Sequence, residues 1–285
     1  MNDLRSYLLE TEVVIHAGGL SERWFPVTQG KIPKPLTEVG KKKRPMIDWT
    51  ILPYVIAGVK VFYVTLWHNP QPLIDHFKDI QNNTDLKFVP LIEPIDRRMG
   101  RAGVLKFYNQ KGQFNFDKPI LSLNSDDIIK LDVQELAKFQ FTGLKKYFFA
   151  TVVGSSQEIS PYGRIKYNPK SNEVATFVEK PSFKLPEGEL ANTGIFYIDS
   201  SLVSYFKEIK EEEFPVDLER SRMMQDHIVK KMRALDLAIL GKTWFVLNNP
   251  QEYKTMKDFD FEKFFGITSI ERYLGDYRPT NNIKL

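Results

Sequence analysis

VVIHAGGLSERWFPVTQGKIPKPL, residues 13–36, joins a short apolar run to a glycine pair and then to two cationic side chains. The glycines are Gly18 and Gly19, and the cations are Arg23 and Lys34, the second of which stands between prolines. Glycine has no Cβ, so its backbone can approach a ligand closely and adopt unusual dihedral angles. Arginine can bind a phosphate through two parallel hydrogen bonds, whereas lysine acts as a point charge. The stretch therefore predicts a strand followed by an anion-binding loop.

Two familiar phosphate-binding motifs fit this loop poorly. A Walker loop needs Gly-Lys followed by Ser or Thr, and a dinucleotide loop needs Gly-x-Gly-x-x-Gly at the start of a helix. Residues 18–26 contain neither that third glycine nor room for a helix before Pro26. A surface loop whose Arg23 and Lys34 pair with nearby acids is the alternative when the loop is considered alone.

The composition is that of a globular protein of 285 residues with a net charge of +4. This charge is spread over 40 basic and 36 acidic residues, so it gives no argument for nucleic-acid binding. The chain has no cysteine, which excludes thiol nucleophiles, disulfides and cysteine metal sites. It also lacks a signal peptide pattern and an apolar run of about 18 residues, so we expect a cytoplasmic protein without a membrane partner. The basic block at residues 41–44 predicts a solvated loop, with attraction of a polyanion as the alternative.

Short β-branched runs alternate with longer amphipathic runs through the first half of the chain, which predicts an α/β fold with a mostly parallel sheet. The predicted strands are residues 13–16, 61–65, 87–91, 120–124 and 148–153. The predicted helices are residues 46–58, 71–79, 102–109 and 133–141, and Pro53 predicts a kink or a late start in the first. From residue 162 the pattern predicts a small β-meander, and later one more strand pair at residues 235–240 and 243–247.

Three polar loops leave the carboxyl ends of the predicted strands, at residues 17–34, 93–103 and 124–132. Ligands of open α/β sheets bind at these ends, so we expect the loops to converge on one crevice. The third loop contains Asp126-Asp127, and Mg²⁺ with bound phosphate commonly takes one or two carboxylates. Turn or capping chemistry is the alternative for this pair.

Several motifs follow one another in a characteristic order: AGGLSERWFPVTQGKIPKPLTEV, RPMIDWTI, GRAGVLKF, LNSDDIIKLD, PYGRIKY, FVEKP, LANTGIFYID and TWFVLNNPQEY. This order is typical of the sugar-1-phosphate nucleotidyltransferases, which the chain resembles over residues 13–257. The sequence is similar to the glucose-1-phosphate thymidylyl- and uridylyltransferases and their mannose-1-phosphate guanylyltransferase relatives. The resemblance implies a Rossmann-like mixed sheet flanked by helices, with the meander holding the sugar. It also implies a nucleotidyltransferase domain over residues 1–258 and a C-terminal extension over residues 259–285.

The resemblance further implies an enzyme that transfers a nucleoside monophosphate from an NTP to a sugar 1-phosphate, with Mg²⁺ or Mn²⁺ as cofactor and a homo-oligomer as assembly. The implied catalytic residues are Arg23 and Lys34, and the implied metal ligand is Asp126. The implied nucleotide-binding residues are Ala17, Gly18, Gly19, Gly100 and Gly103. The implied sugar-phosphate residues are Gly163, Glu179, Lys180, Asn192 and Thr193. The histidines match no catalytic position, so we interpret His16, His68, His76 and His227 as structural.

Several positions depart from the family pattern, among them Ser21 before Glu22 and Asn248 where the family has a glycine. Glu22 places a carboxylate in the phosphate loop, and Val246 stands where the family has a second metal-binding aspartate. Arg101 adds a positive charge after Gly100, and Ile95 stands near the place of a base-reading glutamine. Glu22 and Val246 keep open an alternative function, that of a catalytically weakened paralogue that binds NTP or NDP-sugar and regulates a partner. A glycosyltransferase with Asp126-Asp127 as its metal motif is a third reading, which the retained lysines of PKP and EKP disfavour.

Overall fold

The computed structural model describes residues 10–134, 148–153, 162–181, 190–218, 232–236 and 244–276. Within these ranges the side chains of residues 23, 26, 27, 148–153, 201–204, 235 and 236 are outside the description. Most of the helix predicted at residues 133–141 lies outside the described residues, as do His227 and residues 237–240.

The chain divides into two compact units, each assembled from three segments. The first unit comprises Met1–Val14, Asp96–Leu123 and Glu135–Lys242, and the second comprises Ile15–Ile95, Asn124–Gln134 and Thr243–Leu285. Strands β1 (Glu12–His16) and β6 (Ile120–Asn124) begin in the first unit and end in the second. The short helical turns are η1 (Glu22–Trp24), α2 (Phe25–Thr28), η2 (Lys34–Leu36) and η3 (Glu211–Glu213).

Parallel strands characterise the second unit. β1 is the neighbour of β4 (Val61–Leu66), and β4 pairs in parallel with β5 (Lys87–Ile92). All of β1 is buried, as is typical of a parallel strand covered on both faces. The helices of this unit are α3 (Met46–Ile56), α4 (Gln71–Asn83), α8 (Pro250–Met256), α9 (Phe261–Phe265) and α10 (Glu271–Leu274).

Helix α3 is buried along nearly its whole length because it is apolar on all sides. It begins at Met46, as predicted, and continues through Pro53. Trp49 lies against Phe261 and Phe265 of α9, with ring centroids 5.2 and 6.3 Å apart. Helix α3, from the first segment of the second unit, is thus covered in part by α9, from the last segment of the same unit.

The basic block of residues 41–44 has two different environments. Its three lysines are exposed, and Lys41 Nζ lies 3.1 Å from Asp260 Oδ2. Arg44, on the short strand β3 (Arg44–Pro45) beside β2 (Glu38–Val39), is instead buried. Its Nε lies 3.0 Å from Oδ2 of the fully buried Asp48, whose Oδ1 lies 2.8 Å from His76 Nε2. The prediction of a solvated loop is therefore wrong for Arg44, because a buried carboxylate one helical turn later requires a cation.

Antiparallel pairing characterises the first unit. β9 (Arg164–Tyr167) lies between β10 (Val174–Val178) and β11 (Leu190–Ile198), which is the predicted meander. β11 also pairs with β6 and with β8 (Phe148–Val153), two strands whose bounds agree with the prediction. The helices here are α5 (Gly100–Gln110) and α7 (Ser200–Glu208).

The predicted strands at residues 235–240 and 243–247 are present where the structure describes them, at residues 235–236 and 244–246, but the prediction that they pair with each other is wrong. β12 (Met232–Asp236) pairs in parallel with β8, whereas β13 (Trp244–Val246) pairs antiparallel with β7 (Asp127–Ile129). β7 lies within the stretch that we predicted to be a loop. Both partners are distant in sequence, so the local pattern could not identify them.

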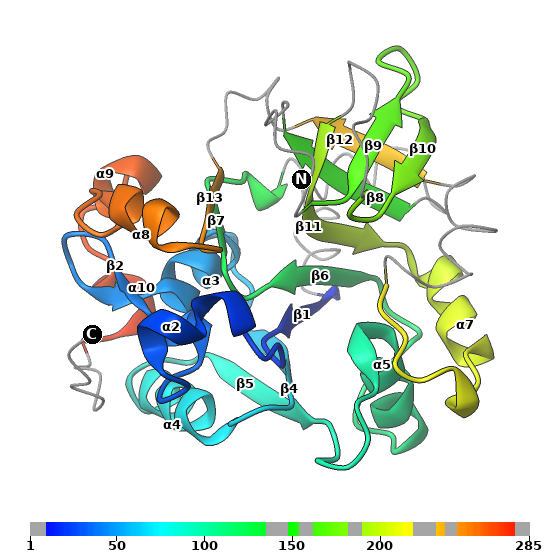
Figure 1. Cartoon of the computed structure of the whole chain (residues 1–285), viewed down its shortest axis with the longest axis horizontal. Helices are drawn as coiled ribbons and strands as arrows, with labels where there is room; N and C mark the ends of the chain where they lie inside the picture. The colour runs from blue at the N-terminus through cyan, green and yellow to red at the C-terminus, as the bar shows by residue number, and fades with distance from the viewer. Residues whose placement is uncertain are drawn as a thin grey trace. The chain divides into compact units, whose positions relative to one another are not determined.

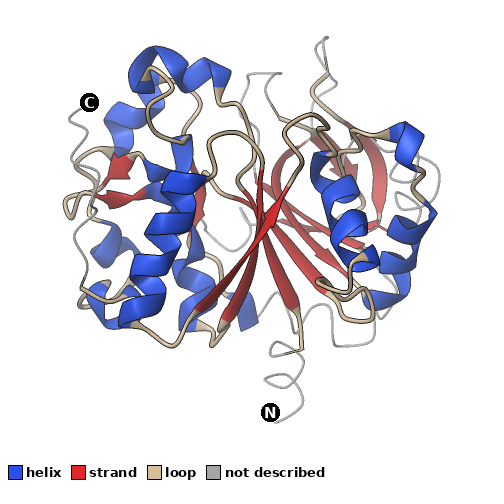
Figure 2. Ribbon diagram, turned by 90° about the horizontal axis from the view of Figure 1, so that it is seen from below, coloured by secondary structure: helices blue, strands red, loops and turns tan. Residues whose placement is uncertain are grey.

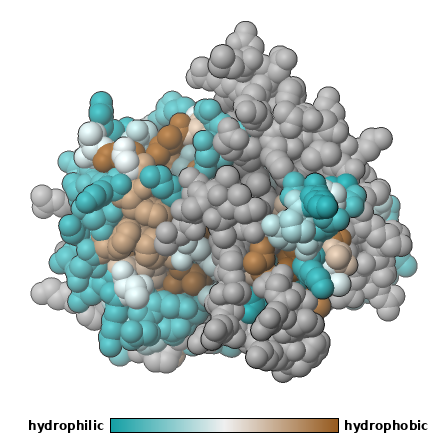
Figure 3. Space-filling model, turned by 90° about the horizontal axis from the view of Figure 1, so that it is seen from above, coloured by the Kyte–Doolittle hydropathy of each residue, from teal (hydrophilic) through white to brown (hydrophobic). Residues whose placement is uncertain are grey.

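The predicted fold class, a mixed and mostly parallel sheet flanked by helices, is confirmed (Figures 1 and 2). On the face shown in Figure 3, hydrophilic side chains cover much of the described surface and some hydrophobic ones lie between them. In the part of the chain that the structure describes, no helix has both the length and the apolar character needed to cross a membrane.

Candidate active site

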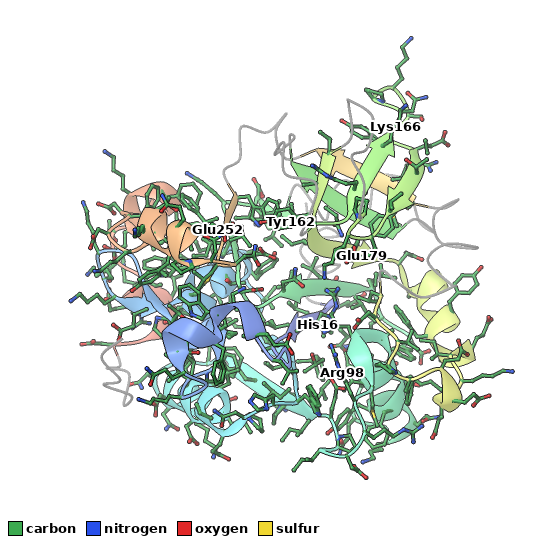
Figure 4. The ribbon with its side chains drawn as sticks, viewed as in Figure 1. His16, Arg98, Tyr162, Lys166, Glu179 and Glu252 are labelled. Carbon is green, nitrogen blue, oxygen red and sulfur yellow. The ribbon has the colours of Figure 1, made fainter. Side chains whose placement is uncertain are left out.

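The glycine loop leaves the buried end of β1 and packs against the end of β4. The backbone N–H of Ala17 donates to the Thr65 carbonyl at 3.0 Å. A Cβ on Gly18 would lie 3.1 Å from the Trp67 nitrogen, whereas a Cβ on Gly19 would meet no atom within 4 Å. Close packing therefore explains Gly18, while the open space at Gly19 leaves room for a ligand. His16, also at this strand end, lies with Nδ1 3.0 Å from the Thr65 hydroxyl (Figure 4).

The turn that carries Arg23 is anchored by its neighbour Trp24. The Trp24 indole is buried and donates to the Thr37 hydroxyl at 2.9 Å. Ser21 before the turn has φ 54°, a left-handed conformation that favours glycine. The Arg23 side chain lies outside the description, and Glu22 is exposed to solvent. The backbone of this turn is thus fixed by a buried tryptophan.

Lys34 is the residue through which the first and third loops meet. It stands in η2, flanked by Pro33 and Pro35, and is only 8% exposed. Its Nζ forms an ion pair with Oδ2 of Asp126. The structure thus brings together the two residues that the sequence assigned to charge stabilisation and to metal binding.

Asp127 is turned toward other partners than its neighbour Asp126. Its carboxylate accepts hydrogen bonds from Asn124 Nδ2 at 2.8 Å and from Trp244 Nε1 at 2.9 Å. Burial, and next the negative charge of Asp126, raise the pKa of Asp127 to about 7, although the two hydrogen bonds and Lys34 act in the opposite direction. The sequence analysis missed Asn124 and Trp244; the indole N–H was the available signal, because a buried tryptophan usually donates to an acceptor.

Asp127→Asn should change how stability depends on pH in a metal-free buffer. The folded chain holds this proton to about pH 7, whereas the unfolded chain loses it near the ordinary pKa of 3.8. Between these values the unfolded state binds fewer protons, so the free energy of unfolding of the wild type falls as pH rises. The amide cannot ionise, so the unfolding free energy of the variant minus that of the wild type should rise by on the order of 2 kcal/mol from about pH 5 to about pH 8. Urea unfolding in EDTA measures this difference, and a value independent of pH would contradict the raised pKa.

The described side chains around Asp126 could hold a metal ion only if water and substrate phosphates supplied most of its ligands. Among the described residues no group of three or more His, Cys, Asp or Glu side chains could hold a metal ion. Val246, opposite Asp127 in the β7–β13 register, has no side-chain oxygen to offer, and the Asp127 carboxylate already accepts two hydrogen bonds. A single carboxylate suits Mg²⁺ that keeps water and substrate phosphates as its other ligands, but does not suit a site made of protein ligands alone.

The first unit gathers most of the residues expected to bind the sugar phosphate. A Cβ on Gly163 would lie 2.6 Å from Glu179 Oε2, so the glycine makes room for this carboxylate. Glu179 follows β10 (Figure 4). Lys180 Nζ lies 3.5 Å from Glu179 Oε1. The N–H of Asn192 donates to the Gly163 carbonyl at 2.8 Å, and Thr193 beside it is buried. This cluster of carboxylate, ammonium and amide groups has the chemistry of a polyol and phosphate site.

Close packing, which the sequence did not reveal, explains why two positions of α5 are glycine. A Cβ on Gly100, at φ 74°, would lie 2.7 Å from the Val216 carbonyl, and a Cβ on Gly103 would lie 2.8 Å from the Phe214 ring. The same Val216 carbonyl accepts from the Ala102 N–H at 2.9 Å. Close packing at the start of α5 therefore requires both glycines, and their expected contact with the nucleotide stays a prediction.

An α/β sheet that ends in a cationic glycine loop and a pair of carboxylates is typical of proteins that bind phosphorylated ligands. The chain belongs to the Nucleotidyl transferase family, whose model matches residues 12–261.

The chain is also similar to individual proteins of known name and to solved structures. The chain is 26% identical over 275 residues to mannose-1-phosphate guanylyltransferase 1 of Arabidopsis thaliana, a match that covers 96% of this chain and 68% of that protein. It is 31% identical over 216 residues to a mannose-1-phosphate guanyltransferase of Debaryomyces hansenii, which covers 74% of this chain and 57% of that protein. The crystal structure of HddC from Yersinia pseudotuberculosis complexed with GMP-PN is similar with a TM-score of 0.65 at 20% identity, covering 89% and 99% of the two chains. That last likeness shows the fold.

Proposed function

We propose that the chain transfers a nucleoside monophosphate from an NTP to a sugar 1-phosphate, releasing pyrophosphate and leaving an NDP-sugar. The contact between Lys34 and Asp126 is the observation that carries this proposal, since it joins a cation and a carboxylate at the strand ends of a family member. The names of the relatives in Arabidopsis thaliana and Debaryomyces hansenii support a sugar 1-phosphate as acceptor. They also make mannose 1-phosphate with GTP the first substrate pair to test.

The proposed chemistry needs no protein nucleophile. A sugar 1-phosphate is ionised at neutral pH, so its own oxygen can attack the α-phosphorus of the NTP in line with the departing pyrophosphate. The chain then acts by positioning both substrates and by neutralising charge. The absence of cysteine agrees with this requirement, as does the burial of His16 and His76 in contacts with Thr65 and Asp48.

Each residue set has a role in this scheme. Arg23 and Lys34 stabilise the negative charge that develops on the phosphates, next to the glycine loop. Asp126 would hold Mg²⁺ or Mn²⁺ bound to the nucleotide, and such a cation polarises phosphoryl oxygens. Glu179 accepts hydrogen bonds from sugar hydroxyls, while Lys180 pairs with the sugar phosphate.

Pyrophosphate release tests the proposal directly. The purified chain is incubated with each NTP and with glucose, mannose, galactose or N-acetylglucosamine 1-phosphate, with and without Mg²⁺. We expect release that requires both substrates and Mg²⁺ and yields the matching NDP-sugar by mass spectrometry. No release with any pair would reject the proposed activity.

A regulatory paralogue is the second candidate function. Val246 beside Asp127 favours it, because Asp126 is then the one acid left to hold a metal among the described residues of this strand end. Binding of an NDP-sugar measured by calorimetry, together with no pyrophosphate release, would support this second function.

A further inference from the structure

Lys34 is a buried ammonium with a carboxylate partner. The residue is 8% exposed, whereas the Asp126 side chain that pairs with it is 26% exposed. Removing an ammonium from water is costly unless an opposite charge lies against it. In this state of the chain, Asp126 supplies that charge through Oδ2.

Among the described residues, Asp126 has no second acidic side chain beside it that is available to a metal ion. The two oxygens of Asp127 accept from Asn124 and Trp244, and the residue opposite Asp127 on β13 is Val246. A divalent cation that arrived alone would have to displace Lys34 from Asp126 and would gain a single carboxylate. Mg²⁺ loses its water reluctantly, so this exchange has little to favour it.

We propose that Lys34 occupies Asp126 until a triphosphate arrives, and that the chain consequently binds a divalent cation only weakly when no nucleotide is present. On nucleotide binding, the ammonium moves from the carboxylate to phosphate oxygens, and Asp126 becomes available to the cation that the nucleotide carries. The ammonium keeps an anionic partner throughout, so it is never buried alone. The part of this inference that involves the nucleotide rests on the proposed function, whereas the part that concerns the cation alone does not.

Titration with Mn²⁺ in the absence of nucleotide tests the inference. Electron paramagnetic resonance of free Mn²⁺ gives the Kd for the wild type, for Lys34→Met and for the double variant Lys34→Met/Asp126→Asn. Removing the competing ammonium should tighten Mn²⁺ binding by about tenfold or more, and removing the carboxylate as well should abolish that gain. Lys31→Met is the matched control, since Lys31 is an exposed lysine three residues earlier, and its Kd should equal that of the wild type.

Two results would overturn the inference. The first is an equal Mn²⁺ affinity for the wild type and for folded Lys34→Met or Lys34→Gln, with folding checked by thermal unfolding. The second is a micromolar Kd for Mn²⁺ binding to the wild type without nucleotide. This result needs no variant, so it applies even where the variants fail to fold. A chain that shows the Lys34-dependent gain but releases no pyrophosphate with any substrate pair would support this inference and reject the proposed function.

Discussion

Asp126→Asn should lower kcat/KM for nucleotidyl transfer by about 10² to 10³, the usual cost of losing one charge-stabilising group. The amide keeps the shape of the side chain but loses the negative charge that pairs with Lys34 and would hold the cation. Arg23→Ala should cause a similar loss, because it removes the guanidinium assigned to the phosphates. Initial rates of pyrophosphate release, with both substrates varied, measure these effects.

Asp85→Asn is the matched control for the loss of a carboxylate. Asp85 also pairs with a lysine, since its Oδ1 lies 2.8 Å from Lys60 Nζ, but this pair is on the surface. Its kinetics should equal those of the wild type. If Asp126→Asn and Arg23→Ala both retained kcat/KM within about tenfold of the wild type while Asp85→Asn behaved normally, the assignment of the site would be wrong.

Asp48→Ala should destabilise the chain by about 3–5 kcal/mol, because it removes the single carboxylate between two buried partners. Asp48 is fully buried, with Arg44 Nε at 3.0 Å on one oxygen and His76 Nε2 at 2.8 Å on the other. Alanine would leave the Arg44 charge without that carboxylate in a buried position. Urea unfolding of the variant and the wild type at neutral pH measures the loss. The two curves should have the same m-value, so that the shift in midpoint reports the change in stability.

Two comparison variants test whether the loss of stability comes from the buried charge cluster. Asp48→Asn keeps an acceptor in place and should lose less stability than Asp48→Ala. Asp85→Ala removes a carboxylate from an exposed pair in the same unit, and such pairs contribute little because water and salt screen them. Equal unfolding midpoints for Asp48→Ala and Asp85→Ala would show that the buried cluster does not stabilise the fold.

Elements with a strong local pattern were predictable from the sequence. The strands at residues 120–124 and 148–153 have the predicted bounds, because a short, mostly apolar run bounded by polar or turn-forming residues is typical of a buried strand. α5 begins at Gly100, two residues earlier than predicted, because the Val216 carbonyl and the Asp217 carboxylate accept hydrogen bonds from its first turn. Those partners lie more than a hundred residues away, so no local pattern reports them.

In the candidate site, too, some features could be predicted from the local sequence and others depend on contacts between distant residues. Lys34 and Asp126 could be selected because each follows a predicted strand, and strand ends are where ligands bind. Their direct contact joins residues 92 positions apart, and the hydrogen bond between Asp127 and Trp244 depends on how β7 and β13 pair. That pairing joins residues far apart in sequence, and the apolar run around Val246 predicts a strand without naming its partner.

The discontinuous make-up of the two units has a consequence for biosynthesis. β12 and β13, the partners of β8 and β7, are among the later segments to leave the ribosome, and so is the aromatic helix that covers Trp49. A nascent chain that ends before residue 244 therefore exposes tryptophan and leaves a strand edge open, both of which attract chaperones. Neither unit can be completed before its last segment is synthesised, so we expect the first unit to finish folding only after β12 has left the ribosome, and the second only after β13 and the helices that follow it have done so.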